Sequence, residues 1–361
     1  AESIAGTDNP VGLRYISAFF RAGLPILVAA VALLGRGSLR FAVVALILGV
    51  GSAFIGLGGR VMHVERTFFG VHRVTTNEKG TWNVLHHGTT LHGLQLRTQA
   101  LLQPGMPVPD ADFRNRLFYG KPQDFTRDNR TPYYYLIPTT YYHPSGPIGD
   151  VMGLLITHNR LKEVALIGMG TGSLATYGRP GSRFTMIEID PAVVGIATNP
   201  KYFSYVADAL GAGELFVGDG RIVMNGINDR TFDLIAIDAF SSDAIPVHLI
   251  TKEAIEVYLS KSAPNGLLAF HISNRYFDLA PVLTRLGQEL NLHVYRRNDD
   301  VITKEQAAEG KKDSTWVVLC RKPEDFAPLS TLPNWQLMRP DRRYPLWTDD
   351  YSNVLDVFVG W

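Results

Sequence analysis

The chain has 361 residues, which is long for one compact domain, so we expect at least two folding units. Its 35 Lys and Arg residues almost balance its 34 Asp and Glu residues, and the net charge of +1 argues against a nucleic-acid partner held by bulk electrostatics. The single cysteine, Cys320, excludes an internal disulfide, disfavours a thiolate zinc site and fits a reducing compartment.

Two apolar runs lie near the start of the chain. Residues 22–35 are fourteen uncharged residues, and residues 41–59 are nineteen more. A helix needs about 20 apolar residues to cross the hydrocarbon core, so the second run qualifies directly and the first only if it extends backwards. We therefore expect residues 1–60 to be a transmembrane segment with two helices, at about 14–35 and 40–59. A buried hairpin or an interfacial anchor is the alternative.

Residues 61–146 predict a small β-rich domain. Polar and apolar residues alternate over 64–76 and again over 81–96, and the turn-forming residues Asn77–Gly80 separate the two runs. A second turn is expected inside the later run, which makes a small antiparallel unit. The segment 102–131 is rich in Pro, Gly, Asp and Arg with little periodicity, and predicts a long excursion.

From residue 147 to about 325, short apolar runs alternate with helical stretches. Seven of the runs predict strands: EVALIG, RFTMIEI, ELFVGD, FDLIAID, GLLAFHIS, LHVYR and TWVVLC. Such alternation is typical of the α/β class and predicts a Rossmann-like, doubly wound, seven-stranded and largely parallel sheet with helices on both faces. Residues 326–361 are expected to be a tail that packs on this domain. Ligands of such sheets bind at the carboxyl ends of the strands, near the switch point.

The first predicted strand is followed by a G-x-G-x-G turn formed by Gly168, Gly170 and Gly172. Glycines allow a tight turn and a close approach of the backbone to a ligand, and the N-terminus of the helix expected next favours electron-rich groups. A purely structural turn would also explain them. Glu188 ends the second strand, where an acid can accept both hydroxyls of a ribose. Asp190 precedes a proline and is interpreted as a helix-start residue.

Further acids end the next two strands. Asp219 and Gly220 belong to the motif GDGR after the third strand, with Asp219 placed to reach an adenine amine, and Asp238 ends the fourth strand with Asp243 in the following loop. Acids gathered around one cleft raise each other's pKa unless a cation lies among them. We expect a nucleoside site here, although Asp238 and Asp243 could also be loop caps.

The glycine spacing, GDGR and the fourth-strand acid resemble the class I S-adenosylmethionine-dependent transferases. Dinucleotide dehydrogenases usually have their third glycine three residues after the second, whereas here it falls two after. More narrowly, residues 63–290 resemble the spermidine synthase (aminopropyltransferase) family: a small β-unit, the glycine loop, IEID, GDG and then D-x-x-x-x-D. The apolar runs and WTDDYSNVL (347–355) resemble its membrane-fused bacterial subgroup.

This resemblance implies a co-substrate, S-adenosylmethionine or its decarboxylated form, and no metal. The residues expected to hold it are Gly168, Gly170, Thr171, Gly172, Glu188, Asp219 and Gly220. Asp238 would be the general base that deprotonates a nucleophilic amine, and Asp243 would grip that amine. Tyr142 and His143 stand where the family has a Tyr-Gln pair lining the amine site, and His92 is a further candidate to touch the substrate.

Several positions depart from the family pattern. Thr171 takes the place of an acid that faces the free amine of the decarboxylated donor, so intact S-adenosylmethionine is also credible. His87 stands where an acid is usual.

His86 and His87 cannot both ligate a metal from one regular strand, because successive side chains point to opposite faces, so we expect turn and cleft histidines. His271 is interpreted as core or cleft rim. The pair at 349–350 caps a helix or closes over the site.

The function we expect is a membrane-anchored transferase that moves an aminopropyl group to an amine. A methyltransferase on the same scaffold and a non-catalytic nucleoside-sensing domain are the alternatives. Expected partners are a small-molecule amine acceptor and the lipid bilayer, with no nucleic acid, and a homo-oligomer stays open. Because the donor is made in the cytoplasm, we expect a multi-pass protein of the inner (cytoplasmic) membrane whose catalytic domain faces the cytoplasm.

Overall fold

The computed structural model describes residues 59–88, 90–97, 137–209, 212–227, 231–239, 246–341 and 343–359. The two expected transmembrane helices, the excursion at 102–131 and Asp243 lie outside these residues. Within them, no helix combines the length and the apolar character that crossing a membrane requires.

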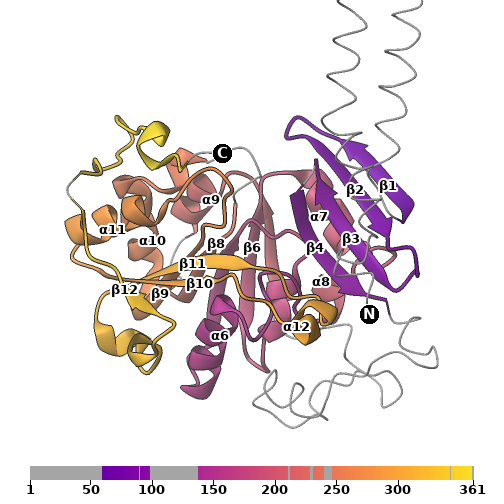
Figure 1. Ribbon diagram of the computed structural model, residues 1–361, viewed down its shortest axis with the longest axis horizontal. Helices are drawn as coiled ribbons and strands as arrows, with labels where there is room; N and C mark the ends of the chain where they lie inside the picture. The colour runs from indigo at the N-terminus through magenta and orange to yellow at the C-terminus, as the bar shows by residue number, and fades with distance from the viewer. Residues whose placement is uncertain are drawn as a thin grey trace, which may run out of the picture.

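The small β-unit is a four-stranded antiparallel meander (Figure 1). Its strands follow one another in the sheet in chain order: β1 Arg60–Arg66, β2 Val71–Thr76, β3 Trp82–His87 and β4 Thr90–Leu96. The turn predicted after β2 is present, and the Asn77 side chain accepts the backbone N–H groups of Thr81 and Trp82 at 2.7 and 3.0 Å.

The first alternating run holds two strands where the sequence indicates one. The chain turns between β1 and β2, and the Thr67 N–H donates to the Gly70 carbonyl at 2.8 Å. Phe68 and Phe69 sit in this turn and are exposed. A pair of large apolar residues is typical of a strand, so the turn was not evident from the pattern.

The second sheet contains all seven predicted strands and a short eighth one. Its order is β12-β10-β11-β9-β8-β5-β6-β7. The bounds are β5 Glu163–Ile167, β6 Arg183–Glu188, β7 Ala212–Val217, β8 Phe232–Ile237, β9 Ser262–His271, β10 His293–Asp299, β11 Ser314–Cys320 and β12 Gln336–Leu337. Strands β5 to β9 pair in parallel, whereas β11 is antiparallel to both β9 and β10, so the sheet is mixed.

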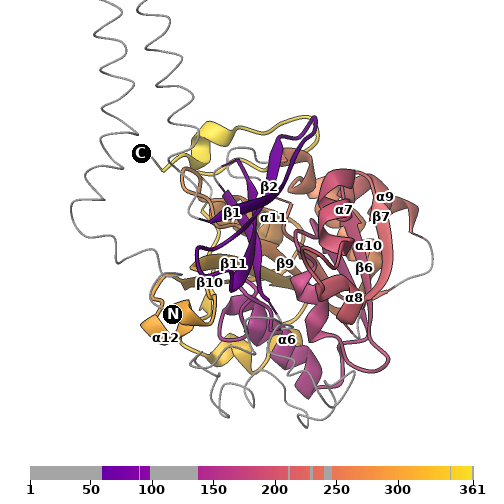
Figure 2. The ribbon, with the colours of Figure 1, turned by 90° about the vertical axis from the view of Figure 1, so that its right-hand side faces the viewer.

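Helices cover both faces of this sheet, as the α/β pattern predicts. Alternate residues of β5 belong to two different cores: Val164 and Leu166 to one, Ala165 and Ile167 to the other. Figures 1 and 2 show α6 on one side of the sheet and α9, α10 and α11 on the other. The helices are α6 Pro147–Thr157, α7 Pro191–Thr198, α8 Tyr205–Asp208, α9 Gly220–Gly226, α10 Lys252–Lys261, α11 Ala280–Glu289 and α12 Lys304–Ala308.

The small sheet packs on the large domain through α7 and the chain that follows it. Val74 and Leu85 of the small sheet share a core with Ile196, Tyr202 and Phe203. A polar contact fixes how the two units dock: the buried amide of Asn83 donates to the Tyr202 carbonyl at 2.6 Å. The two units are therefore held together by a shared apolar core and by a hydrogen bond that fixes their relative orientation.

The C-terminal tail contacts the core on the α10 and α11 side. The Trp347 side chain is fully buried there, and its carbonyl accepts the Lys252 N–H at 2.9 Å. Val357 is buried in the same core, and its carbonyl accepts the Asp278 N–H at 2.9 Å.

The turn after β5 gives a first testable prediction. Gly168 has φ +86°, and a Cβ there would lie 2.1 Å from the Asp238 carbonyl oxygen. Gly181 has nearly the same φ of +87°, but no atom lies within 4 Å of its Cβ position. In Gly181→Ala only the left-handed backbone is strained, which costs about 1–2 kcal/mol. Gly168→Ala adds a collision and should lower the free energy of unfolding by about 1–3 kcal/mol more.

Denaturant unfolding of the two variants, monitored by circular dichroism, measures this difference. Equal losses in both would mean that the β5 and β8 turns are not held against each other.

Candidate active site

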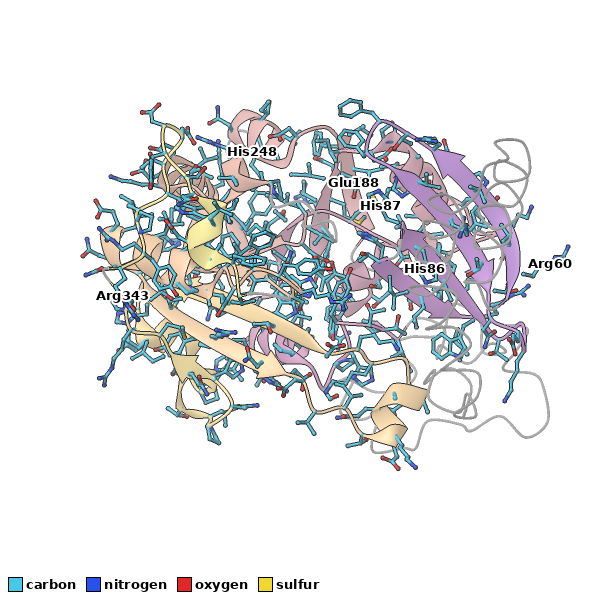
Figure 3. The ribbon with its side chains drawn as sticks, turned by 45° about the horizontal axis from the view of Figure 1, so that its top comes forward. Arg60, His86, His87, Glu188, His248 and Arg343 are labelled. Carbon is cyan, nitrogen blue, oxygen red and sulfur yellow. The ribbon has the colours of Figure 1, made fainter. Side chains whose placement is uncertain are left out.

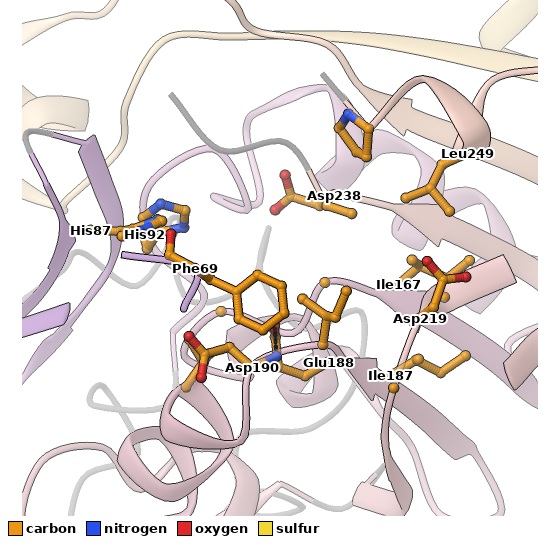
Figure 4. A pocket seen from close by; sticks show the side chains of 18 of the residues that line it. Phe69, His87, His92, Ile167, Ile187, Glu188, Asp190, Asp219, Asp238 and Leu249 are labelled. Carbon is orange, nitrogen blue, oxygen red and sulfur yellow. Dashed lines mark hydrogen bonds between the residues drawn. The ribbon is translucent and has the colours of Figure 1, made fainter. Parts of the chain in front are cut away.

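A cavity of about 340 Å³ lies at the carboxyl ends of β5, β6, β7 and β8. From β5 the chain proceeds to β6 on one side and β8 lies on the other, so the cavity is at the switch point of the sheet. Its size is within the range of small-molecule sites. Figure 4 shows His87 and His92 entering from the small sheet on one side and Asp219 on the opposite side, with Glu188 and Asp238 between them.

The glycine loop forms part of the floor. Gly168 and Gly170 line the cavity, and a Cβ on Gly170 would lie 3.1 Å from the His92 carbonyl oxygen. The loop leads into a 3-10 helix, Ser173–Tyr177, and not into the α-helix that the sequence analysis expected. The loop therefore offers backbone at close approach to a ligand, and a short 3-10 helix follows it.

Thr171 and Gly172 do not line the cavity. The Thr171 side chain is buried, and its Cγ2 and Oγ1 lie 2.6 Å from where Gly93 of β4 would carry a Cβ. Thr171 thus packs under the small sheet, in contrast to the expected position facing the donor amine. Gly172 packs against the Val206 side chain.

Glu188 ends β6 at the inner wall. Its carboxylate accepts the Met169 N–H on one oxygen and the Asp190 N–H on the other, both at 3.1 Å. Each carboxylate oxygen has a second lone pair, so both can still accept a hydroxyl. Burial raises the pKa of Glu188, against the opposing effect of the backbone N–H donors. Figure 3 shows Glu188 and His87 in the middle of the molecule, with Arg60 and Arg343 at opposite outer ends.

Asp219 and Gly220 lie at the opposite end of the cavity. Asp219 lines it and also caps α9, accepting the Ile222 N–H at 2.9 Å. Its other oxygen accepts His248 Nε2 at 2.7 Å. Gly220 lets the start of α9 contact the Ile167 side chain, because a Cβ there would lie 2.3 Å from Cγ2.

Asp238 is hydrogen-bonded to two buried side chains. His271 Nδ1 donates to its Oδ1 at 2.6 Å, and the Tyr142 hydroxyl donates to its Oδ2. Burial, reinforced by the Asp238 charge, raises the pKa of Tyr142 well above its usual value, so the phenol stays protonated. Tyr142 was expected to line the amine site; it instead reaches the site through Asp238, while its neighbour Tyr141 lines the cavity.

The contact of His271 with Asp238 was missed by the sequence analysis, which placed His271 in the core or at the rim. A signal was available. Strands β8 and β9 are adjacent and parallel with Ile237 opposite Phe270, so the next residues of the two strands are neighbours.

Histidines of the small sheet form the wall that faces Asp238. His92 lines the cavity, and burial lowers its pKa to about 4 although the Asp238 charge opposes this, so it is neutral at pH 7. Its Nε2 is buried, and none of the described residues hydrogen-bonds to it. The prediction that His92 touches the substrate is compatible with this position. His87 also lines the cavity, with Nε2 2.9 Å from the Phe69 carbonyl.

Asp190 joins the two folding units beside the cavity. It caps α7 by accepting the Ala192 N–H at 2.9 Å, which confirms its role as a helix-start residue. Its Oδ2 accepts the Thr67 hydroxyl at 2.6 Å and His72 Nε2 at 2.7 Å. Burial opposes ionisation, yet these donors hold the pKa of Asp190 below its usual value. The turn thereby fixed carries Phe69, which lines the cavity.

Other predicted residues lie elsewhere. His143 is buried outside the cavity lining, with Nδ1 3.0 Å from Ser145 Oγ and Nε2 3.5 Å from Glu309. Asp349 accepts two hydrogen bonds from Arg221 at 2.6 and 2.7 Å, which ties the tail to α9 away from the cavity lining. Within the part of the chain that the structure describes, no group of three or more His, Cys, Asp or Glu residues could hold a metal ion.

Two curated proteins illustrate what this chain is similar to. A polyamine aminopropyltransferase from Vibrio vulnificus is 31% identical over 119 residues, which is 32% of this chain and 38% of that protein. An eEF1A lysine and N-terminal methyltransferase from Xenopus laevis is 34% identical over 87 residues, 22% of this chain and 12% of that protein. The chain thus matches well under half the length of either relative, and both are transferases by name. No protein-family model matches the sequence.

Solved structures of the same two kinds also match. A probable spermidine synthase from Corynebacterium glutamicum gives a TM-score of 0.46 at 14% identity, covering 73% of this chain and 80% of that one. An O-methyltransferase from Streptomyces achromogenes gives 0.35 at 16% identity, covering 49% and 80%.

The raised pKa of Glu188 makes a second prediction. As the pH falls, a carboxyl with a raised pKa takes up its proton earlier than an ordinary glutamate, and the protonated form is a poorer acceptor for two hydroxyls. With methylthioadenosine as a probe of the expected nucleoside site, the affinity measured by calorimetry should therefore drop by roughly 10–100-fold on acidification, from a midpoint above the usual glutamate value.

Glu188→Gln is the matched control, because it keeps the shape of the side chain and cannot titrate. It should bind weakly at neutral pH and lose this step. Identical pH profiles for the variant and the wild type would exclude Glu188 from the nucleoside site.

Proposed function

We propose that this chain is a transferase that takes an aminopropyl group from an S-adenosylmethionine-type sulfonium and joins it to an amine, releasing methylthioadenosine. The observation that carries the proposal is the convergence of Glu188, Asp219 and Asp238 with a close-approach glycine loop on one cavity. The 31% identity to a polyamine aminopropyltransferase supports the same reaction class.

The donor fits the cavity group by group. Glu188 has lone pairs left for both ribose hydroxyls, and Asp219 at the far end can accept an adenine amine. Gly168 and Gly170 leave room for the donor to lie against the backbone. A cationic sulfonium is favoured between these carboxylates by charge.

Asp238 is the general base of the proposed reaction. A protonated amine has no lone pair for attack, and a carboxylate within hydrogen-bond reach both binds the ammonium and accepts its proton. The freed nitrogen attacks the carbon next to sulfur; the C–N bond forms as the C–S bond breaks, and the electron pair stays on sulfur as a neutral thioether. The proton lost by nitrogen ends on Asp238.

Methyl transfer from intact S-adenosylmethionine is the second candidate. It is supported by the 34% identity to a methyltransferase. Because Thr171 is buried against Gly93, Thr171→Asp would bury a carboxylate and is a poor test of donor choice. Donor choice is better measured directly on the wild type.

We also propose that residues 1–60 anchor the protein in the inner (cytoplasmic) membrane with the transferase domain in the cytoplasm. The two apolar runs support the anchor, and the cytoplasmic supply of the donor supports the orientation. A reporter fused after residue 361 should be active only in its cytoplasmic form. Activity of a periplasmic reporter at that point would contradict the proposal.

Calorimetry and turnover together test the reaction. The wild type should bind methylthioadenosine and the sulfonium donor that it uses, intact or decarboxylated S-adenosylmethionine. Asp238→Asn should keep donor affinity within about threefold and lower the transfer rate by roughly 10²–10⁴-fold, as expected for loss of a general base. Asp300→Asn removes a charge from an exposed position and should leave both unchanged.

The outcomes separate the candidates. If the wild type binds none of these ligands, both transferase functions fail. Use of the carboxylated donor alone excludes aminopropyl transfer. Binding without transfer of either group would favour the nucleoside-sensing alternative.

A further inference from the structure

The carboxylate of Asp238 is clamped from two elements. His271, at the end of β9, donates from Nδ1 to one oxygen at 2.6 Å, and Tyr142 donates its hydroxyl to the other. Only 6% of the Asp238 side chain and 9% of the His271 side chain are exposed. His271 and Tyr142 are both buried, so the surrounding side chains hold them in place.

The imidazole of His271 is stacked between two aromatic rings. The Tyr141 ring stacks on it at 4.2 Å with 23° between the planes, and the Trp316 ring stacks on the other side at 4.9 Å and 27°. The register of β9 and β11 places Trp316 directly opposite His271. Rotation of the imidazole is therefore blocked on both faces.

Among the described residues, the imidazole of His271 has its hydrogen-bond partner on the Nδ1 side. Its Nε2 is buried, and no described residue hydrogen-bonds to it, so Asp238 is the partner that the described residues provide. A carboxylate can only accept, which requires the proton of the neutral ring to sit on Nδ1. A buried apolar slot would hold a phenylalanine at lower desolvation cost, so a histidine here calls for a role that involves Asp238.

We propose that His271 is a positioning residue for the transfer reaction: it fixes the Asp238 carboxylate in the orientation that meets the acceptor amine. This inference rests on the proposed function. With Tyr142 and His271 on its two oxygens and the Tyr141 hydroxyl beside it, the carboxylate needs no reorientation during proton transfer. The donor end of the cavity, formed by Glu188 and Asp219, does not involve His271.

Two substitutions separate the hydrogen bond from the packing. His271→Phe keeps a flat ring between Tyr141 and Trp316 but has no donor. His271→Asn loses the ring but can place an amide N–H near the position of Nδ1. We expect His271→Phe to lower kcat by about 10–100-fold with methylthioadenosine affinity unchanged within about twofold. His271→Asn should recover most of that loss, to within about fivefold of the wild type.

A double-mutant cycle supplies the second measurement. In an Asp238→Asn background, His271→Phe should cost less than about twofold in kcat, because the carboxylate that it serves is gone. Nitrogen NMR of the imidazole gives a readout that does not depend on activity: His271 should carry its proton on Nδ1 in the wild type and lose that preference in Asp238→Asn.

Each outcome bears on the inference. A fully active His271→Phe, or an equal loss in the presence and absence of Asp238, would overturn it while leaving the proposed function intact. A parallel fall of Tm, donor affinity and kcat would make His271 structural only and would also overturn it. A wild type that transfers neither group would remove the proposed function, and this inference with it.

Discussion

The site depends on one close backbone approach at the centre of the large sheet. The turns after β5 and β8 touch so tightly that position 168 has no room for a Cβ, and the Asp238 N–H donates to the Ile167 carbonyl at 2.8 Å. On the other side, the Gly168 N–H donates to the Ile187 carbonyl at 2.8 Å, one residue before Glu188. These two bonds set the distance between Glu188 and Asp238.

Three of the acids at the ends of the strands are each hydrogen-bonded to a histidine. Asp190 is paired with His72, Asp219 with His248 and Asp238 with His271, at 2.7, 2.7 and 2.6 Å. Glu188 accepts backbone N–H groups instead, and burial raises its pKa. Each of these acids thus has its own hydrogen-bond donors, and each imidazole also fixes the rotamer of its acid.

The sequence predicted what local pattern encodes. Buried strands are apolar runs, and residues that end parallel strands share one edge of the sheet, so the positions of Gly168, Glu188, Asp219 and Asp238 followed from spacing. The partner of Asp190 did not, because His72 lies 118 residues away and reaches it only when the two units dock. His248 and His271 lie 29 and 33 residues from their acids within the large domain, and these contacts were not predicted either. Thr171 shows the same limit: its place in the loop was evident, but the sequence could not indicate that Gly93 of another sheet covers it.

Asp190 belongs to the large domain, yet two of its three side-chain partners come from the small sheet. The same docking brings Phe69, His87 and His92 to the cavity, which those residues line. The large domain alone would lack the part of the cavity wall that these residues form, and Asp190 would lose two of its donors. The binding site is therefore complete only when the two units are docked.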